Sequence, residues 1–156
     1  MKILVVYYSR TGLTKKVALQ LAIELGAEAE EIIDKKNRAG VLNYMICGRE
    51  AMKKILAEIE SPKNDPTGYD LVLIGTPVWA GTMASPVRSY LSVQKDKLKR
   101  VAFFVTQGGA GANRTIDNMA DLIGLKSAAS LTVLSKEVVK DDYREKLTQF
   151  ISEIKK

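Results

Sequence analysis

Three short polar segments of the sequence carry residue types that bind phosphate groups and flat rings. The first, Ser9–Thr14, has hydroxyl side chains at Ser9, Thr11 and Thr14 around Gly12. It lies between an apolar run and a helical pattern, so its backbone N–H groups would gather at a helix N-terminus, where a phosphate dianion binds. Glycine lets the backbone come close to such a ligand. We predict a phosphate cradle here; the alternative is an ordinary hydroxyl-capped turn.

The other two segments could contact a planar ligand. The segment Thr76–Met83 holds Trp79, the only tryptophan of the chain, and an indole ring can stack on a flat heterocycle. The segment Thr106–Asn113 is rich in glycine, which leaves backbone N–H groups free to approach a ring edge. The alternatives are a tryptophan that only packs against the sheet and a merely flexible turn.

Each polar segment follows an apolar run that reads as a buried strand. We expect strands at Ile3–Tyr8, Ala29–Ile33, Leu71–Ile74, Val101–Val105 and Ala128–Leu134. Apolar residues at helical spacing follow each run. We expect helices at Thr14–Leu25, at Val41–Ile59 with a break near Gly48, after Ser85-Pro86 and at Ile116–Leu122. A final helix is expected to bury the apolar stripe Tyr143, Leu147, Phe150, Ile151 and Ile154. Ser85 and Asp141 are the expected N-caps, and Gly26 and Gly124 are the expected helix ends.

Alternating strands and helices predict an α/β fold, a three-layer, doubly wound, five-stranded parallel sheet in the order 2-1-3-4-5. No linker or repeat interrupts the pattern, so residues 1–156 are expected to form a single domain. In such sheets ligands bind beyond the carboxyl ends of the strands, where the strand order reverses. That rule places the three polar segments side by side, around a ligand with one phosphate and one flat ring.

Composition excludes several kinds of chemistry. The chain has no histidine, so neither a Ser-His-Asp triad nor a His-ligated metal site is available, and its one cysteine rules out a multi-cysteine metal site. We therefore predict no metal and assign no catalytic side chain. The net charge of +6 comes from 24 basic and 18 acidic residues, dispersed along the chain in a way typical of a solvated surface rather than of nucleic-acid binding. No export signal or membrane-length apolar run is visible, which favours a cytoplasmic protein without membrane insertion.

The motifs together resemble the flavodoxin-like family. Ser9–Thr14 fits the family's phosphate loop, Ser/Thr-x-Thr-Gly-x-Thr, at every fixed position. Gly75–Pro86 looks like the flavin-contacting loop of the family's shorter members, and Thr106–Gly109 resembles their third loop. The likeness extends over the whole chain in element order. Family electron carriers are acidic, however, and usually place a second aromatic on the flavin, where this chain has glycines.

The resemblance implies noncovalent FMN and an FMN-binding domain. The residues that it assigns to FMN are Ser9, Arg10, Thr11, Gly12, Leu13 and Thr14 at the phosphate, Pro77, Val78, Trp79, Ala80, Gly81 and Thr82 at the ring, and Thr106, Gln107, Gly108 and Gly109 at its other edge. The implied function is electron transfer through FMN, either as a carrier or as an FMN-dependent oxidoreductase of the NAD(P)H/quinone type. The expected partners are a redox protein, a small acceptor such as a quinone, or NAD(P)H, and the expected assembly is a monomer or homodimer.

Three alternatives share this architecture. A low-molecular-weight phosphatase needs a cysteine in the first loop, and a response-regulator receiver needs acidic strand ends; this chain has neither. A non-enzymatic interaction module with a decayed flavin site stays open.

One segment has no place in this scheme. Val41, Leu42, Tyr44, Met45 and Ile46 form an apolar cluster, which either packs under the sheet edge or serves as a lid or dimer contact beside the flavin. Cys47 within this segment is expected to be a packed small residue, because no histidine is available to activate it.

Overall fold

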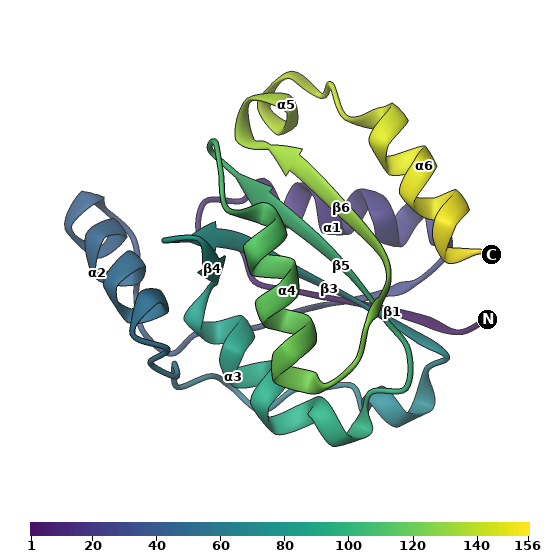
Figure 1. Cartoon of the computed structure of the whole chain (residues 1–156), viewed down its shortest axis with the longest axis horizontal. Coiled ribbons are helices and arrows are strands. Elements are labelled where there is room, and N and C mark those ends of the chain that lie inside the picture. Colours follow the sequence, from purple (N-terminus) through teal and green to yellow (C-terminus); the bar gives the residue numbers. More distant parts are fainter.

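The computed structural model describes all residues, 1–156, as a parallel sheet between two layers of helices (Figure 1). Its parallel strands are β1 (Ile3–Tyr7), β2 (Glu28–Glu31), β3 (Leu71–Trp79), β5 (Val101–Gln107) and β6 (Ser127–Leu134). They pair in the order β2-β1-β3-β5-β6, and a short strand β4 (Thr82–Met83) pairs antiparallel with β3. Among the parallel strands alone this is the predicted order 2-1-3-4-5, so the predicted fold class is confirmed.

The inner strands are long runs of buried apolar residues because helices cover both of their faces. On one face lie α1 (Leu13–Leu25), α5 (Ser135–Lys140) and α6 (Arg144–Ile154). On the other face lie α2 (Val41–Met52), α3 (Ser85–Gln94) and α4 (Ala112–Ile123). Short 3-10 turns at Pro66–Gly68 and Lys95–Lys97 complete the chain, and no helix is long and apolar enough to cross a membrane.

The third strand is longer than predicted. We expected it to end at Ile74, but it continues through Pro77, which pairs with Thr106, to Trp79. Trp79 then pairs with Thr82 of β4, so the predicted second loop is a tight hairpin. Its turn residues, Ala80 and Gly81, have φ angles of 49° and 75°. Two successive positive φ angles are typical of the type I′ turn that closes two-residue hairpins.

The helix predicted over 41–59 is also different. It ends at Met52 instead of Ile59, and Gly48 lies inside it without a break. Lys54 adopts a left-handed conformation, with φ of 56°, that turns the chain out of the helix. Ile59 then forms an isolated antiparallel bridge with Asp34, and Glu60 N–H donates to Ile33 O.

Two predicted helix caps are wrong, whereas two predicted helix ends are confirmed. Ser85 is the first residue of α3, after the N-cap Ala84, and its hydroxyl has no hydrogen-bond partner. Asp141 ends the unpredicted helix α5 in a left-handed conformation, and Tyr143 is the N-cap of α6. Gly26 and Gly124 end α1 and α4 in left-handed conformations.

Candidate cofactor-binding site

A polar cavity of about 250 Å³ opens at the carboxyl edge of the sheet. It lies where the N-terminus of α1 meets the ends of β3 and β5, as the sheet order requires. Its lining residues are Arg10, Thr11, Leu13, Thr14, Tyr44, Pro77, Val78, Trp79, Thr106, Gln107, Gly108 and Ser135. Because Arg10 is the only charged residue among them, the cavity suits an anion.

The first loop has the geometry of an anion site. Gly12 adopts a left-handed conformation before α1, and its N–H donates to Ser9 Oγ over 3.0 Å, which closes the loop. Lys16 N–H makes the first bond of the helix, to Gly12 O, so the preceding N–H groups of the first turn have no partner within α1. The hydroxyls of the buried Thr14 and Thr106 lie 2.7 Å apart and fix this loop to the end of β5.

The third loop packs against the hairpin. A Cβ on Gly111, which has φ of 103°, would stand 2.9 Å from Gly81 Cα and 3.0 Å from Val78 Cγ1, so only glycine allows this approach. Gln107 Oε1 accepts a bond from Ala112 N–H over 2.9 Å and thereby caps the N-terminus of α4. A Cβ on Gly108 or Gly109 would meet no atom within 4 Å, so the backbone at these two positions is open to a ligand.

Trp79 is mainly a packing residue. Its side chain is buried at 6% exposure, and its ring meets Tyr8 edge-on with centroids 5.5 Å apart. Burial and then the nearby carboxylate of Asp34 raise the pKa of Tyr8 above its ordinary range, so that side chain stays neutral. The packing interpretation of Trp79 therefore holds for most of the ring, although the residue also lines the cavity.

A buried ionic cluster centred on Arg38 packs against the ring of Trp79. The guanidinium of Arg38 lies 5.5 Å from the Trp79 ring centroid, pairs with Asp34 and Glu50, and donates to Cys47 Sγ over 3.6 Å. Burial alone would lower the pKa of Arg38, but its hydrogen bonds to the two carboxylates outweigh burial and raise it. The cluster joins α2, through Glu50 and the buried Cys47, to the core, so Cys47 is packed as predicted.

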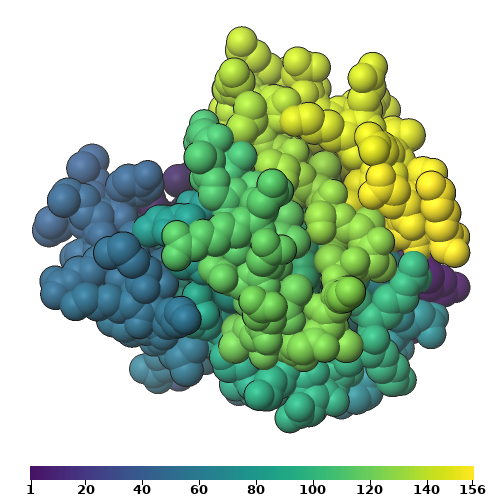
Figure 2. All heavy atoms as spheres, viewed as in Figure 1, coloured from purple at the N-terminus to yellow at the C-terminus, as the bar shows by residue number.

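The apolar cluster at the start of α2 does not pack under the sheet edge. Val41, Leu42, Tyr44 and Met45 are exposed by 63% or more, and α2 protrudes at the left of Figure 2. Only Cys47 and Ala51 of this helix are buried. The packing alternative is therefore wrong. The Arg10 guanidinium lies 5.3 Å from the ring centroid of Tyr44, which brings α2 to the rim of the cavity.

The structure brings most of the sequence-predicted residues together. Ten of them line the cavity, whereas six do not: Ser9, Gly12, Ala80, Gly81, Thr82 and Gly109. Ser9 and Gly12 shape the first loop. Thr82 points away, because its buried hydroxyl accepts bonds from Arg88 Nη2 and Asn118 Nδ2, each over 3.1 Å. Sequence reasoning missed Tyr44 and Ser135 as cavity residues; Ser135 follows the last strand, so the same strand-end rule could have found it.

Comparisons with known proteins agree with this geometry. A flavoprotein from Lactobacillus acidophilus, solved in complex with FMN, is 29% identical, with 89% of this chain and 97% of that chain covered and a TM-score of 0.74. The NMR structure of the apo-form of the flavoprotein from the same organism is 26% identical, with 89% and 95% covered and a TM-score of 0.62. Oxidised flavodoxin 2 from Bacillus cereus, at 15% identity, shares the fold with a TM-score of 0.61 over 99% of this chain and 97% of that chain.

No curated protein matches the sequence. A sequence profile described as flavodoxin matches residues 2–150, almost the entire chain. This chain therefore belongs to the flavodoxin family.

Proposed function

We propose that this protein binds FMN noncovalently in the polar cavity and transfers electrons through it. The observation that carries the proposal is the meeting of the α1 N-terminus with the ends of β3 and β5 around one cavity without a carboxylate. The FMN complex of the 29% identical Lactobacillus acidophilus flavoprotein supports it further. Bound FMN supplies the electron chemistry, because it accepts and donates electrons that protein side chains cannot carry.

The residues of the first loop would hold the phosphate. The free N–H groups at the start of α1 and the hydroxyl of Thr11 are hydrogen-bond donors for its oxygens, and Arg10 adds a positive charge at the rim. Thr14 acts indirectly: its bond to Thr106 keeps the loop in place against β5. A dianion fits this arrangement better than a neutral group, because no acidic side chain opposes it.

The hairpin and the third loop would border the flavin ring. Pro77, Val78 and Trp79 form an apolar wall of the cavity, and the open backbone of Gly108 offers N–H groups for ring oxygens or nitrogens. The absence of nearby carboxylates favours extra negative charge on the ring after reduction. These residues bind and orient the cofactor, and none of them needs to transfer a proton.

Of the two redox roles, we favour a reductase of small acceptors over a pure carrier. The observation behind this choice is the exposed apolar side of α2, which stands beside the cavity and offers a surface for a second molecule. In that role bound FMN would supply two-electron chemistry between NAD(P)H, which is oxidised to NAD(P)+, and a quinone, which leaves as the hydroquinone. Of the two hydrogens that the hydroquinone gains, one comes from the hydride and one from solvent.

The test is a comparison of FMN with riboflavin, which lacks the phosphate. We expect the purified full chain to quench FMN fluorescence on binding, and to bind riboflavin at least about tenfold more weakly, because charge-assisted bonds at the phosphate are worth about 1.5–3 kcal/mol each. Thr14→Val should weaken FMN binding, whereas the matched change Thr148→Val, on the exposed side of α6, should not. Equal affinity for the two flavins would refute the phosphate site, and no binding of either would favour the decayed module.

Turnover separates the two redox roles. The FMN-loaded protein should oxidise NAD(P)H steadily in the presence of menadione, and should do so only with FMN added. Reduction by dithionite without any such turnover would support the carrier role instead.

A further inference from the structure

A second cavity, of about 350 Å³, lies between α2 and the hairpin. It shares Tyr44, Val78 and Trp79 with the polar cavity, so the two hollows meet at a common wall. Its other lining residues include Met45, Gly48 and Arg49 from α2. Unlike the first cavity it contains none of the phosphate-loop residues, and six of its eight lining residues are hydrophobic.

The small size of residue 48 keeps this cavity open, and the backbone at this position does not require a glycine. It lies inside α2, where glycine is less favourable than alanine because it gains no side-chain packing and loses more backbone freedom. Its φ angle is not positive, and a Cβ at this position would meet only Ala80 Cβ, at an ordinary 3.9 Å. Ala80 lines the same cavity, so any larger side chain at position 48 would project toward its opposite wall.

Arg49 gives the cavity its only charge. This exposed guanidinium forms no ion pair and no side-chain hydrogen bond, although Lys36 and Arg38 nearby in the sequence both pair with Glu50. No acidic residue lines the cavity. An acidic group on a ligand would therefore meet a free partner at this mouth.

The walls favour a flat ring. Tyr44 and Trp79 present aromatic surface, and Met45 and Met52 supply flexible, polarisable side chains that adapt to ring compounds. Tyr44 and Met45 remain exposed although their burial in a core would be favourable, which leaves apolar area free for a ligand.

We propose that this second cavity binds a planar, mainly apolar ring compound that carries one acidic group, with the ring between α2 and the hairpin and the acid at Arg49. The proposal goes beyond the FMN site, because it concerns binding at separate residues. If FMN occupies the first cavity, the ligand would lie next to it across the shared wall of Val78 and Trp79.

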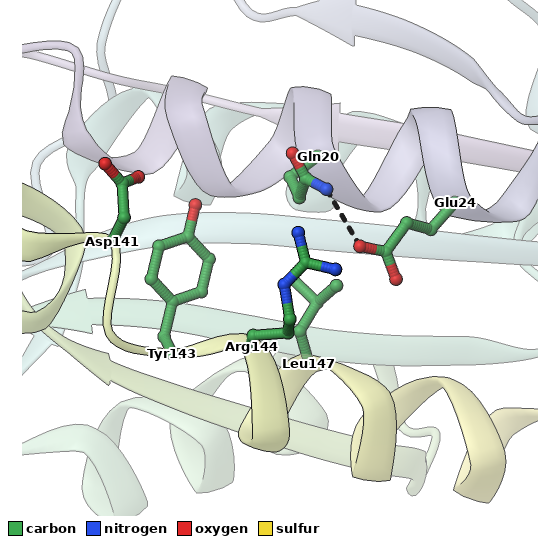
Figure 3. A pocket seen from close by; sticks show the side chains of 6 residues that line it. All are labelled: Gln20, Glu24, Asp141, Tyr143, Arg144 and Leu147. Carbon is green, nitrogen blue, oxygen red and sulfur yellow. Dashed lines mark hydrogen bonds between the residues drawn. The ribbon is translucent and has the colours of Figure 1, made fainter.

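A third hollow on the opposite face of the sheet provides a control. It lies between α1 and α6, is only about 70 Å³, and also contains an exposed arginine, Arg144 (Figure 3). There Arg144 lies beside Glu24, and Asp141 lines the same hollow, so this hollow already contains acidic groups, unlike the second cavity (Figure 3). Arg144→Gln makes the same change in charge as Arg49→Gln, in a smaller hollow that acidic residues of the protein also line.

The probe is anthraquinone-2-sulfonate, and its neutral counterpart is 2-(hydroxymethyl)anthraquinone. Trp79 is the only tryptophan and lines the cavity, so quenching of its fluorescence reports binding in the full chain without any enzymatic activity. We expect the sulfonate to bind more tightly than the neutral ring by up to about fivefold, the upper limit for one solvent-exposed ion pair. Calorimetry gives the same affinities without relying on fluorescence.

The variants locate the site. Arg49→Gln should abolish the advantage of the sulfonate, and Arg144→Gln should retain it. Gly48→Leu should weaken both probes at least about tenfold by filling the cavity, whereas Gly48→Ala should leave both affinities nearly unchanged. Since a leucine or alanine is better tolerated inside a helix than glycine, the urea midpoint of either variant should not fall.

Each titration is repeated with FMN present. Similar probe affinities with and without FMN support a separate second site. Displacement of the probe by FMN would overturn the proposal, because it would make this cavity the seat of the flavin ring. Unchanged binding in Gly48→Leu would overturn it as well, since the probe would then bind elsewhere. Failure of FMN itself to bind, with the probe still bound, would count against the proposed function alone.

Discussion

The two faces of the sheet are built differently. On the face covered by α1, α5 and α6, the apolar side chains of α6 are all buried, at Leu147, Phe150, Ile151 and Ile154. On the other face, α2 buries only Cys47 and Ala51, and most of its larger apolar side chains face solvent. All four buried side-chain atoms that lack a hydrogen-bond partner also belong to this second face, on α3.

This difference indicates that one face of the sheet contributes mainly to stability and the other mainly to ligand binding. In α6 every apolar side chain is buried, and no buried side-chain atom on this face of the sheet lacks a hydrogen-bond partner, as expected where a region only has to be stable. On the α2 face, exposed apolar side chains of α2 and Ala80, which has a left-handed backbone conformation, line the second cavity. The unpartnered polar atoms of α3 lie on the same face of the sheet. Local conflicts of this kind concentrate at sites that bind ligands.

The largest predicted effect contrasts the two outer helices directly. Phe150→Ala should lower the free energy of unfolding by about 3–5 kcal/mol, because it leaves a cavity in a fully packed core. Met45→Ala on α2 should change it by no more than about 0.5 kcal/mol, since that side chain is already 69% exposed. Urea denaturation of both variants measures the contrast. Equal losses would mean that α2 packs as tightly as α6.

The sequence predicted the α6 face better than the α2 face for a physical reason. The apolar stripe of α6 repeats at helical spacing, and burial on the sheet simply follows that pattern. The spacing in α2 is equally helical, but the helix protrudes, and the ionic cluster of Asp34, Arg38 and Glu50 joins it to the segment after β2. Contacts between residues that are distant along the chain are invisible to periodicity.

In the candidate site, too, local motifs could be predicted from the sequence, whereas contacts between distant residues could not. The first loop could be predicted because a glycine and three hydroxyls between a strand and a helix form one local motif. Pro77 and Trp79 were expected in a loop, since proline normally ends a strand; pairing with Thr106 and Thr82 extends β3 over both positions. Tyr44 could not be predicted as a cavity residue, because it lines the cavity only as a result of where α2 lies in the fold.

The second prediction tests whether the ion pairs of Arg38 attach α2 to the rest of the protein. Arg38→Met removes the cation between Asp34 and Glu50 and leaves two carboxylates without their partner, one of them buried. Uncompensated buried charge costs about 3–5 kcal/mol, and we expect a loss near the lower limit because Lys36 still pairs with Glu50. Thermal unfolding checks the value. An unchanged melting temperature would show that α2 is held by its apolar contacts alone.

The third prediction concerns the hairpin turn. Ala80→Gly should raise the free energy of unfolding by up to about 1 kcal/mol, because the left-handed conformation of residue 80 strains any residue with a Cβ. Gly81→Ala should lower it by about 1 kcal/mol for the same reason at φ of 75°. Opposite signs in neighbouring residues, measured by urea denaturation, would verify the turn conformation. A loss in both variants would contradict it.

The fourth prediction is a pH dependence on the α2 face. Burial alone would raise the pKa of Glu50, but hydrogen bonds from Lys36 and Arg38 outweigh it and lower the pKa below the ordinary glutamate value of about 4.3. A carboxyl group whose pKa is lowered by folding stabilises the protein above that value, and the benefit disappears as the pH falls through the lowered pKa. Unfolding between about pH 6 and about pH 3 should therefore be less pH-dependent in Glu50→Gln than in the parent protein. Identical slopes would mean that the ion pairs of Glu50 add nothing.

The smallest expected effect comes from the other buried arginine. Arg88 on α3 has no acidic partner; its Nη2 donates to Thr82, its Nε has no partner, and burial lowers its pKa. Because an unpaired buried cation is itself unfavourable, Arg88→Met should leave the melting temperature unchanged or raise it slightly, while Asn118 still donates to Thr82. A clear drop would show that the guanidinium stabilises the hairpin. If the variant is as stable as the parent protein, Arg88 does not contribute to folding stability, in contrast to the contribution that we expect from Arg38.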